Sequence, residues 1–307
     1  AWVLRKFMNI SGSEGLVAAG NIFMGMTESP VLIKNYLPTM NRSEIFLVMV
    51  SGMGTIAGSV MGTYIGMLGG TDPAAKVLFA THLLSASVMA VPGSIVLAKM
   101  LCPQTEEATD HVAISGKEKE NSNILDAISS GTVTGVKLMT NIAAMLLVFI
   151  SLVALANYIT EGVIGRYTGL NDWIVKITDG KAQGLTFQFI LGVITSPFMW
   201  LIGVPSQDIM LVGSLLGQKT ILNEFVAYFQ LQQWKDAGLF MYEKSILMST
   251  YILCGFANIS SIGILLGGLG VLAPEKRGLI SRIGLPAMIG GALVSVLSAT
   301  IIGMILG

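Results

Sequence analysis

Long uncharged stretches, separated by short charged ones, dominate the chain. A helix that crosses a membrane needs about 20 mainly apolar residues, and five uncharged runs reach that length. They span residues 45–70, 77–98, 138–160, 245–274 and 283–307. This pattern predicts an all-α polytopic membrane protein.

A sixth uncharged run, residues 182–207, is long enough to cross but contains Pro197 and ends near Pro205. Proline inside a helix removes a backbone hydrogen bond, so we expect this run to lie at the membrane interface. Residues 105–131 form the one long polar stretch. We expect a solvated loop there, with a short helix at residues 123–129.

Two further apolar segments are interrupted near their middles. Residues 16–37 are broken by the polar and glycine-containing stretch 25–30, and residues 209–231 by stretches 217–220 and 223–224. Irregular backbone at membrane depth persists only where it is buried or lines a cavity. We therefore expect each segment to be a re-entrant helical hairpin.

A weak internal repeat relates the two interrupted segments. A shift of 193 positions places Ser13 on Ser206 and Thr27 on Thr220. One membrane crossing between the two copies would invert the second copy. Inverted repeats with interrupted helices are typical of secondary transporters.

The repeat predicts three parts of the chain. Each copy has an interfacial helix, a hairpin and two spans. The expected parts are residues 1–101 (first repeat), 102–183 (polar loop and a long scaffold span) and 184–307 (second repeat).

Composition agrees with a membrane protein. Of 307 residues, 53% are hydrophobic and 12% charged, whereas soluble domains carry about 25% charged residues. The 18 basic and 18 acidic residues give no basic surface for nucleic acid. Two cysteines and two histidines are too few for a disulfide framework or a Cys/His metal site.

Glu28 and Glu224 are the acidic residues inside the two predicted hairpins. An ionisable group at that depth is costly unless it faces a cavity or a partner. We expect both to face a cavity; the alternative is a structural carboxylate paired with Lys34 or Lys219.

Polar and small residues also interrupt two of the predicted spans, at residues 54–60 and 255–261. Such side chains offer the backbone alternatives to helical hydrogen bonds, so we expect both stretches to be unwound. Close helix packing through small residues is the other interpretation.

The polar residues of the hairpins and the second unwound stretch suit a polyhydroxylated neutral ligand. Carboxylates accept hydrogen bonds from hydroxyl groups, and an amide both donates and accepts. Thr27, Asn258 and Ser261 add such groups to the two glutamates. A sugar is therefore the expected ligand. Phe256 offers an aromatic face for a planar ring; packing within the span, the more common role of a single phenylalanine there, is the other interpretation.

Three motifs, in this order along the chain, resemble those of the concentrative nucleoside transporter family. They read GNIFMGMTE at residues 20–28, GSLLG and NEFVAY at 213–217 and 223–228, and CGFANI at 254–259. The resemblance covers essentially the whole chain. The family has further helices before the first interfacial segment, so we expect this chain to be a fragment.

The resemblance implies a sodium-coupled symporter that imports nucleosides across the plasma (inner) membrane by alternating access. It further implies a homotrimer that moves its two hairpins and unwound helices together. Expected partners are a nucleoside, sodium and the lipid bilayer, with no nucleic acid and no cofactor beyond the coupling ion. A proton-coupled symporter and a polar-solute channel are the alternatives.

An enzyme is not expected. The sequence contains no HExxH motif, no GxSxG motif and no aspartate pair within a predicted span.

The resemblance also assigns residues. The base would be lined by Thr27, Glu28 and Val60, with Phe256 packed against it. The ribose hydroxyls would be held by Glu224, Asn258 and Ser261. The sodium site would fall on Asn21, Met24, Thr55 and Ile56.

One residue departs from the family pattern. Met26 stands where many members have a glutamine next to the Thr27–Glu28 pair. Methionine cannot hydrogen-bond a base edge but offers a polarizable apolar surface. We therefore expect Met26 to line the base site and purine nucleosides to be accepted well.

Overall fold

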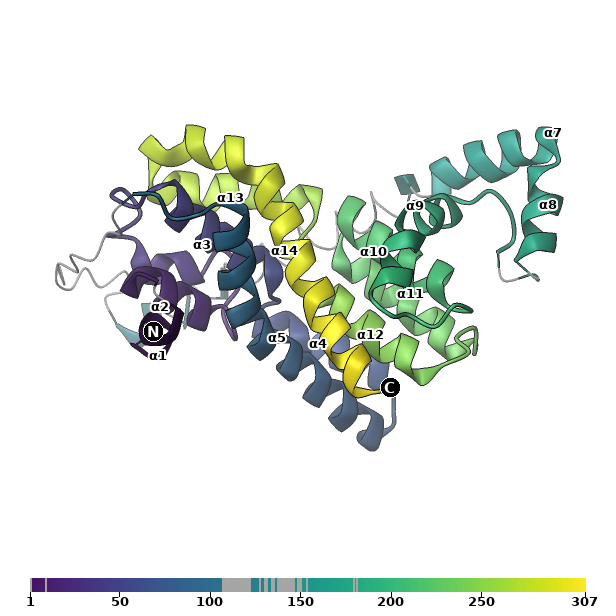
Figure 1. Ribbon diagram of the computed structural model, residues 1–307, viewed down its shortest axis with the longest axis horizontal. Coiled ribbons are helices and arrows are strands. Elements are labelled where there is room, and N and C mark those ends of the chain that lie inside the picture. The colour runs from purple at the N-terminus through teal and green to yellow at the C-terminus, as the bar shows by residue number, and fades with distance from the viewer. Residues whose placement is uncertain are drawn as a thin grey trace. The chain divides into compact units, whose positions relative to one another are not determined.

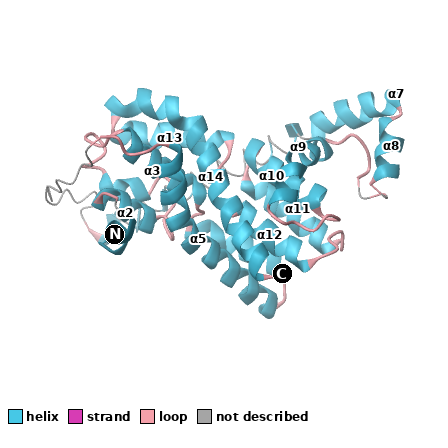
Figure 2. Ribbon diagram, in the orientation of Figure 1, coloured by secondary structure: helices cyan, strands magenta, loops and turns pink. Residues whose placement is uncertain are grey.

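The computed structural model describes residues 2–8, 10–106, 123–126, 128–129, 132–133, 136, 147, 151–152, 154–178, 180 and 182–307. Every regular element in these residues is a helix, which agrees with the predicted all-α class (Figure 2). The predicted loop at 105–131 and the predicted span at 138–160 lie largely outside the described residues. Within the short helix expected at 123–129, residues 124–126 and 128–129 are helical.

The chain forms two compact units. The first combines Ala1–Val112 with Gln188–Gly307, and the second comprises Ala113–Phe187. The second contains the π-helix η2 (Tyr158–Gly165) and the helices α7 (Arg166–Thr168) and α8 (Leu170–Ile177). Asn171 of α8 connects separate segments of this second unit. Its amide nitrogen donates to the Glu161 carbonyl, and its amide oxygen accepts from the Leu185 N–H.

The amino-terminal part of the first unit begins with short helices and ends with a long one. Its elements are α1 (Trp2–Met8), α2 (Gly12–Gly20), the 3₁₀ helix η1 (Ser29–Ile33), α3 (Arg42–Gly54), α4 (Gly58–Gly69) and α5 (Pro73–Leu101). Two helix starts are capping boxes, Ser11 with Glu14 at α2 and Asn41 with Glu44 at α3. Each box satisfies backbone N–H groups that have no partner within the helix.

The carboxyl-terminal part of this unit has a similar order. Its elements are α9 (Phe187–Leu201), α10 (Ile209–Ile221), α11 (Glu224–Asp236), α12 (Glu243–Leu253), α13 (Ile259–Leu272), η3 (Pro274–Lys276) and α14 (Arg277–Ile305). The last helix, α14, packs against α3, α5, α12 and α13, and so joins the two parts (Figure 1).

Among the described residues, three helical segments are long and apolar enough to cross a membrane. They are Arg42–Gly69, Pro73–Leu101 and Pro274–Ile305, and they contain most of the runs predicted at 45–70, 77–98 and 283–307. The run predicted at 245–274 consists of two shorter helices, α12 and α13, with a non-helical stretch between them. The stretch 255–258, which contains Gly255 and Asn258, interrupts the helix as expected.

The second interrupted segment breaks at one place, not two. Helix α10 continues through residues 217–220, and the break lies at Leu222 and Asn223. Gly217 serves packing, since a Cβ built on it would lie 2.6 Å from Leu191 Cβ. Thr220 donates its hydroxyl to the Leu216 carbonyl within the helix. The break expected at 217–220 is therefore wrong, because these polar groups find partners without leaving the helix.

Proline does not break α9 either. Pro197 lies inside the continuous helix Phe187–Leu201. The chain turns only afterwards, at Gly203, whose φ of +85° favours glycine.

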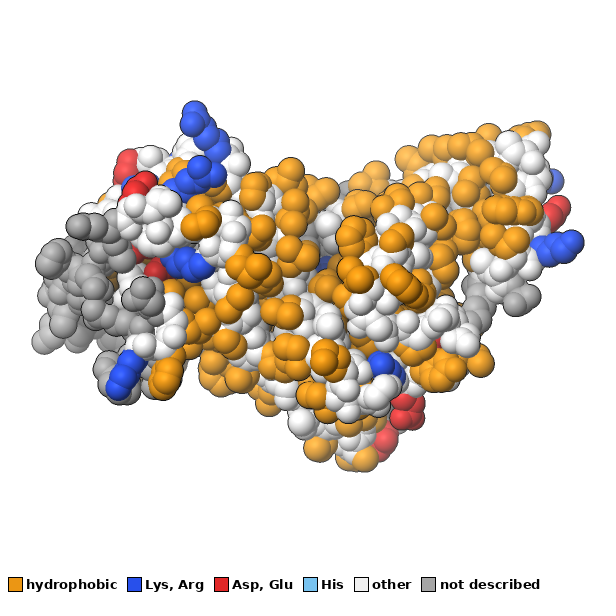
Figure 3. All heavy atoms as spheres, viewed as in Figure 1, with side chains coloured by type: hydrophobic (Ala, Val, Ile, Leu, Met, Phe, Trp, Pro, Cys, Tyr) orange, Lys and Arg blue, Asp and Glu red, His pale blue; other side chains and the backbone are white. Residues whose placement is uncertain are grey.

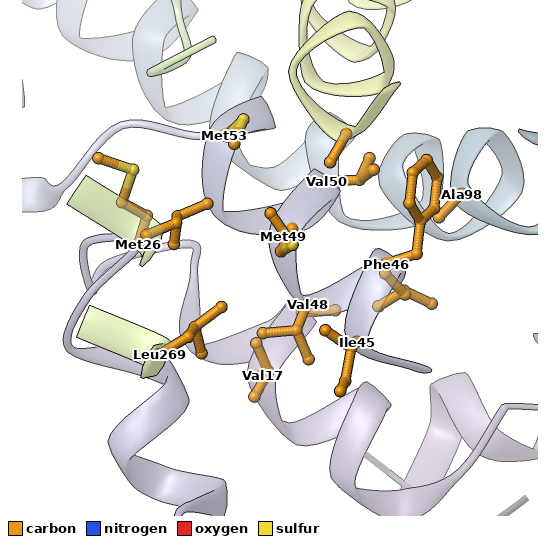
Figure 4. Packing of buried hydrophobic residues seen from close by; sticks show 14 of the residues in the cluster. Val17, Met26, Ile45, Phe46, Val48, Met49, Val50, Met53, Ala98 and Leu269 are labelled. Atoms are coloured by element: carbon orange, nitrogen blue, oxygen red, sulfur yellow. The ribbon is translucent and has the colours of Figure 1, made fainter. Parts of the chain in front are cut away.

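The core of the first unit surrounds α3. Every residue of α3 from Ser43 to Gly54 is buried, and Figure 4 shows Ile45, Phe46, Met49 and Met53 packed with side chains from neighbouring elements. The visible surface is also rich in hydrophobic side chains (Figure 3). A large exposed apolar surface is rare on a protein surrounded by water, and it is typical of a surface that contacts lipid.

Candidate functional site

Two non-helical stretches meet inside the first unit. One lies between α3 and α4, at residues 55–57, and the other between α12 and α13, at residues 254–258. The backbone N–H of Phe256 donates to the Thr55 carbonyl at 3.2 Å. The two predicted unwound stretches therefore form one structural junction.

Glycine allows this close approach. A Cβ built on Gly255 would lie 2.9 Å from the Met53 carbonyl oxygen and 2.8 Å from Ser295 Oγ. A Cβ on Gly291 of α14 would lie 2.7 Å from Met53 Cβ. These glycines thus serve packing as well as unwinding, because a larger side chain would push the stretches apart.

Glu224 is the first residue of α11 and lies beside the junction. Asn223 caps this helix, since its side-chain oxygen accepts from the Val226 N–H at 2.9 Å. The N-terminal end of a helix carries partial positive charge, which favours a carboxylate there. The Glu224 side chain is only 6% exposed, and its Oε2 accepts from Asn258 Nδ2 at 3.0 Å.

Asn258 connects Glu224 to the start of α13. It is the N-cap of that helix, and its Oδ1 accepts from the Ser261 N–H at 2.9 Å and the Ser261 hydroxyl at 3.0 Å. The Ser260 hydroxyl donates to the same oxygen at 2.6 Å. Glu224, Asn258 and Ser261, the three residues that the family resemblance assigns to the ribose, therefore form one hydrogen-bonded chain.

The sequence interpretation missed Tyr64. Its hydroxyl donates to Glu224 Oε1 at 3.2 Å, and its ring stacks on Tyr228 with centroids 4.1 Å apart. Both tyrosines are fully buried. One signal was available: Tyr64 follows Val60 by four positions, which places them on one face of α4.

Lys219 does not serve as the ion-pair partner of Glu224. Its ammonium group is fully buried and donates to the Ile252 carbonyl at 2.7 Å and to Ser295 Oγ at 3.0 Å. Ser295 in turn donates to the Cys254 carbonyl at 3.1 Å. Lys219 on α10 thus donates a hydrogen bond to a carbonyl group at the end of α12. The last carbonyl groups of a helix have no partner within the helix, so this donor satisfies one of them.

The first interrupted segment also contacts an unwound stretch. The backbone N–H of Gly58 donates to the Phe23 carbonyl at 2.9 Å. Asn21 Nδ2 donates to Ser51 Oγ at 2.9 Å, and the Thr55 hydroxyl donates to the Ser51 carbonyl at 3.0 Å. Two of the expected sodium ligands, Asn21 and Thr55, are therefore gathered at the last turn of α3.

Asn21 has an unused acceptor. Its side chain is fully buried, and its Oδ1 has no hydrogen-bond partner among the described residues. A buried acceptor without a partner costs free energy. The carbonyl groups of Met24 and Ile56 belong to non-helical backbone. Neutral oxygen donors of this kind suit a hard monovalent cation.

Among the described residues, no hydrogen bond joins residues 26–28 to the Glu224 chain of hydrogen bonds. Met26 is 7% exposed and belongs to the hydrophobic core, with its Cβ close to Gly52 (Figure 4). Thr27 packs near Gly268 of α13, and the Glu28 side chain is exposed and folds over Gly25.

Comparison with protein families gives two matches. Residues 82–303 match the Na⁺-dependent nucleoside transporter C-terminus, and residues 1–71 match the Gate family described as nucleoside recognition.

Individual relatives agree. The chain is 39% identical to an uncharacterized transporter of Haemophilus influenzae, over 99% of this chain and 68% of that protein. It is also 39% identical to the sodium/nucleoside cotransporter 1 of Rattus norvegicus, over 99% of this chain and 46% of that protein.

Solved structures of CNTnw share the fold. The inward-facing, substrate-bound state gives a TM-score of 0.82 at 36% identity and covers 99% of this chain and 68% of that one. A variant of the same protein in an outward-facing state gives a TM-score of 0.85 at 35% identity, covering 98% and 68%.

These matches settle the class of protein. The chain is that of an integral membrane transport protein and not of an enzyme. It belongs to the concentrative nucleoside transporter family.

Proposed function

We propose that this chain forms the transport core of a sodium-coupled nucleoside symporter in the plasma membrane. The observation that carries the proposal is the hydrogen bond from the Phe256 N–H to the Thr55 carbonyl. Thr55 belongs to the expected ion site and Phe256 to the expected nucleoside site. Since one backbone contact joins them, ordering either site constrains the other.

The nucleoside would be recognised mainly through its ribose. Glu224 Oε2 accepts from Asn258 Nδ2 and Oε1 accepts from the Tyr64 hydroxyl, so the acceptor capacity that these donors leave is available to sugar hydroxyls. The half-buried Phe256 side chain packs against the core around α3 and against a second cluster of buried side chains that includes Tyr64 and Tyr228, and we assign its ring to the base.

Thr27, Glu28 and Val60 remain our proposed base-side residues. Met26 belongs to this proposal as a packing residue behind the base, because its side chain lies in the core.

Sodium coupling is favoured by the unpartnered Asn21 Oδ1. Proton coupling would instead require an acidic or basic group at this position, and Asn21, Thr55 and Ser51 are all neutral. Binding of sodium next to Thr55 raises the affinity for the nucleoside, and thermodynamic linkage requires the reverse effect to be equal. A channel would need no such linkage.

The larger architecture belongs to the same proposal. The order hairpin, broken span and long helix occurs twice, as α2 to α5 and as α10 to α14. We take the two copies, residues 1–101 and 184–307, as inverted repeats whose hairpins re-enter the membrane. The two copies would move together in a homotrimer to alternate access between the two sides.

Uptake of radiolabelled uridine into proteoliposomes tests the function. An inward sodium gradient should drive accumulation that Glu224→Gln abolishes, while Glu243→Gln, an exposed glutamate at the start of α12, leaves uptake unchanged. Accumulation driven only by a proton gradient would contradict the proposed sodium site but would still agree with a nucleoside transporter. Uptake that does not saturate under either gradient would favour a channel.

A further inference from the structure

Tyr64 lies against the carboxylate that we assign to ribose binding. It belongs to α4, the second half of a broken span, and its hydroxyl donates to Glu224 Oε1 at 3.2 Å across 160 positions of sequence. The other oxygen of the same carboxylate accepts from Asn258 on α13 at 3.0 Å. Tyr64 and Asn258 thus come from distant parts of the chain, and each donates a hydrogen bond to one oxygen of the carboxylate.

The Tyr64 ring is fixed on two sides. It stacks on Tyr228 at 4.1 Å with planes inclined by 23°, and meets Phe225 edge-on at 6.0 Å. Tyr228 follows Glu224 by four positions on α11, so both point from the same face of that helix. The Tyr228 hydroxyl donates to the Thr250 carbonyl at 2.8 Å. The Tyr64 hydroxyl therefore has little freedom to follow a rotating carboxylate.

An ionised carboxylate offers about four acceptor positions. Tyr64 and Asn258 each donate to one oxygen, and the backbone N–H of Glu224 also donates to this carboxylate. Donors at both oxygens fix the plane of the carboxylate, and a carboxylate in a fixed plane matches the spacing of a vicinal pair of hydroxyl groups, as on the 2′ and 3′ carbons of ribose. A carboxylate held at only one oxygen could rotate and would lose this match.

We propose that Tyr64 is a positioning residue that makes the Glu224 carboxylate selective for an intact ribose diol. This inference rests on the proposed nucleoside site. Tyr64 touches Glu224 and acts on the substrate through it. Sugar selectivity is consequently shared between α4, which carries the tyrosine, and α11, which carries the carboxylate.

The test compares KM values for uridine, 2′-deoxyuridine and 3′-deoxyuridine in proteoliposomes. Tyr64→Phe keeps the ring and removes only the hydroxyl. A hydrogen bond to a charged group contributes enough to stability that we expect the KM for uridine to rise roughly tenfold. The KM values for the two deoxynucleosides should rise less than about threefold. The ratio of each deoxynucleoside KM to the uridine KM should therefore be smaller in the variant than in the wild type.

Tyr228→Phe is the matched control. It removes a buried tyrosine hydroxyl from the same stack, but one that donates to a backbone carbonyl and not to Glu224. We expect the ratio of KM values to stay at the wild-type value. An equal rise for all three substrates in Tyr64→Phe would reduce Tyr64 to a packing residue and overturn the inference.

A second variant covers the case in which Tyr64→Phe does not fold. Replacement of Tyr64 by 3-fluorotyrosine keeps the hydroxyl and makes it a stronger donor, so the KM for uridine should fall relative to both deoxynucleosides. An unchanged ratio there would also overturn the inference. Wild-type protein that takes up no uridine would instead contradict the proposed function itself.

Discussion

The backbone N–H of Phe256 donates to the carbonyl oxygen of Thr55 at 3.2 Å. Thr55 follows the end of α3 and Phe256 follows the end of α12. Neither backbone group is used within a helix, so the two can form a hydrogen bond with each other. This hydrogen bond joins the non-helical stretch between α3 and α4 to the one between α12 and α13.

Gly255→Ala should destabilise the junction. The added Cβ would lie 2.9 Å from the Met53 carbonyl oxygen and 3.1 Å from the Gly54 carbonyl carbon. Overpacking of this kind typically costs about 1–3 kcal/mol, so the thermal midpoint in detergent should fall. Gly263→Ala is the control, because a Cβ there meets nothing within 4 Å. Equal thermal midpoints for both variants would mean that the backbone at Gly255 can shift enough to accommodate a Cβ without loss of stability.

Thr55→Ala should raise the sodium concentration needed for half-maximal uptake several-fold. The variant removes a side-chain oxygen at the expected ion site. At saturating sodium, the KM for uridine should change little. Thr55→Ser keeps the hydroxyl and should behave as wild type. A large rise in the uridine KM at saturating sodium would argue against separate ion and nucleoside sites.

Lys219→Met should destabilise the end of α12. The variant fills a similar volume but leaves the Ile252 carbonyl without the donor it has at 2.7 Å. A buried carbonyl left unpaired costs roughly 1–3 kcal/mol. Ser295→Ala removes the second partner of Lys219. In a double-mutant cycle of unfolding free energies, the two changes should be non-additive, and strict additivity would indicate that the two groups act independently.

Asp208→Asn should destabilise the contact between the start of α10 and the segment between α11 and α12. The Asp208 carboxylate is fully buried, and its two oxygens accept from the Met241 N–H at 3.0 Å and the Tyr242 N–H at 3.1 Å. Asparagine presents a donor to one of these N–H groups, so about 1–3 kcal/mol of stability should be lost.

The control for that change is Asp236→Asn. The Asp236 side chain is 58% exposed and lies 3.4 Å from its sequence neighbour Lys235. Exposed ion pairs contribute about 0–1 kcal/mol. A denaturant titration in detergent should separate the two variants, and equal losses would show that burial of Asp208 is unimportant.

Inosine should compete fully with labelled uridine for uptake. Met26 offers no hydrogen-bonding group to a pyrimidine edge, and its side chain lies in the core at 7% exposure. The base should therefore be bound by packing, which purines also satisfy. If cytidine competes fully and inosine does not, a pyrimidine edge must be read by another residue.

The amino-acid pattern was sufficient to predict the helical class and most of the spans. The run at 77–98 lies within α5, and the polar residues near 55 and 256 interrupt their spans as expected. The family motifs pointed to the correct family as well. These features depend on the local sequence, on how many apolar residues stand in a row and where small or polar ones interrupt them.

The same reasoning failed where a polar residue found a local or distant partner. Stretch 217–220 was expected to break a helix, yet Thr220 bonds within its own helix and Lys219 reaches the Ile252 carbonyl 33 positions away. Polarity alone does not interrupt a helix. In this segment α11 starts one residue after Asn223, whose own side chain caps the helix by accepting from the Val226 N–H.

The sequence by itself determined that this chain is helical, belongs in a membrane and carries the motifs of a nucleoside transporter. Only the tertiary structure decided which polar groups meet: Tyr64 with Glu224 over 160 positions, and Asn258 with Glu224 over 34. The reason is physical. Burial of apolar runs follows from composition along the chain, whereas a hydrogen bond needs two groups within about 3 Å, and that proximity is set by how the helices pack.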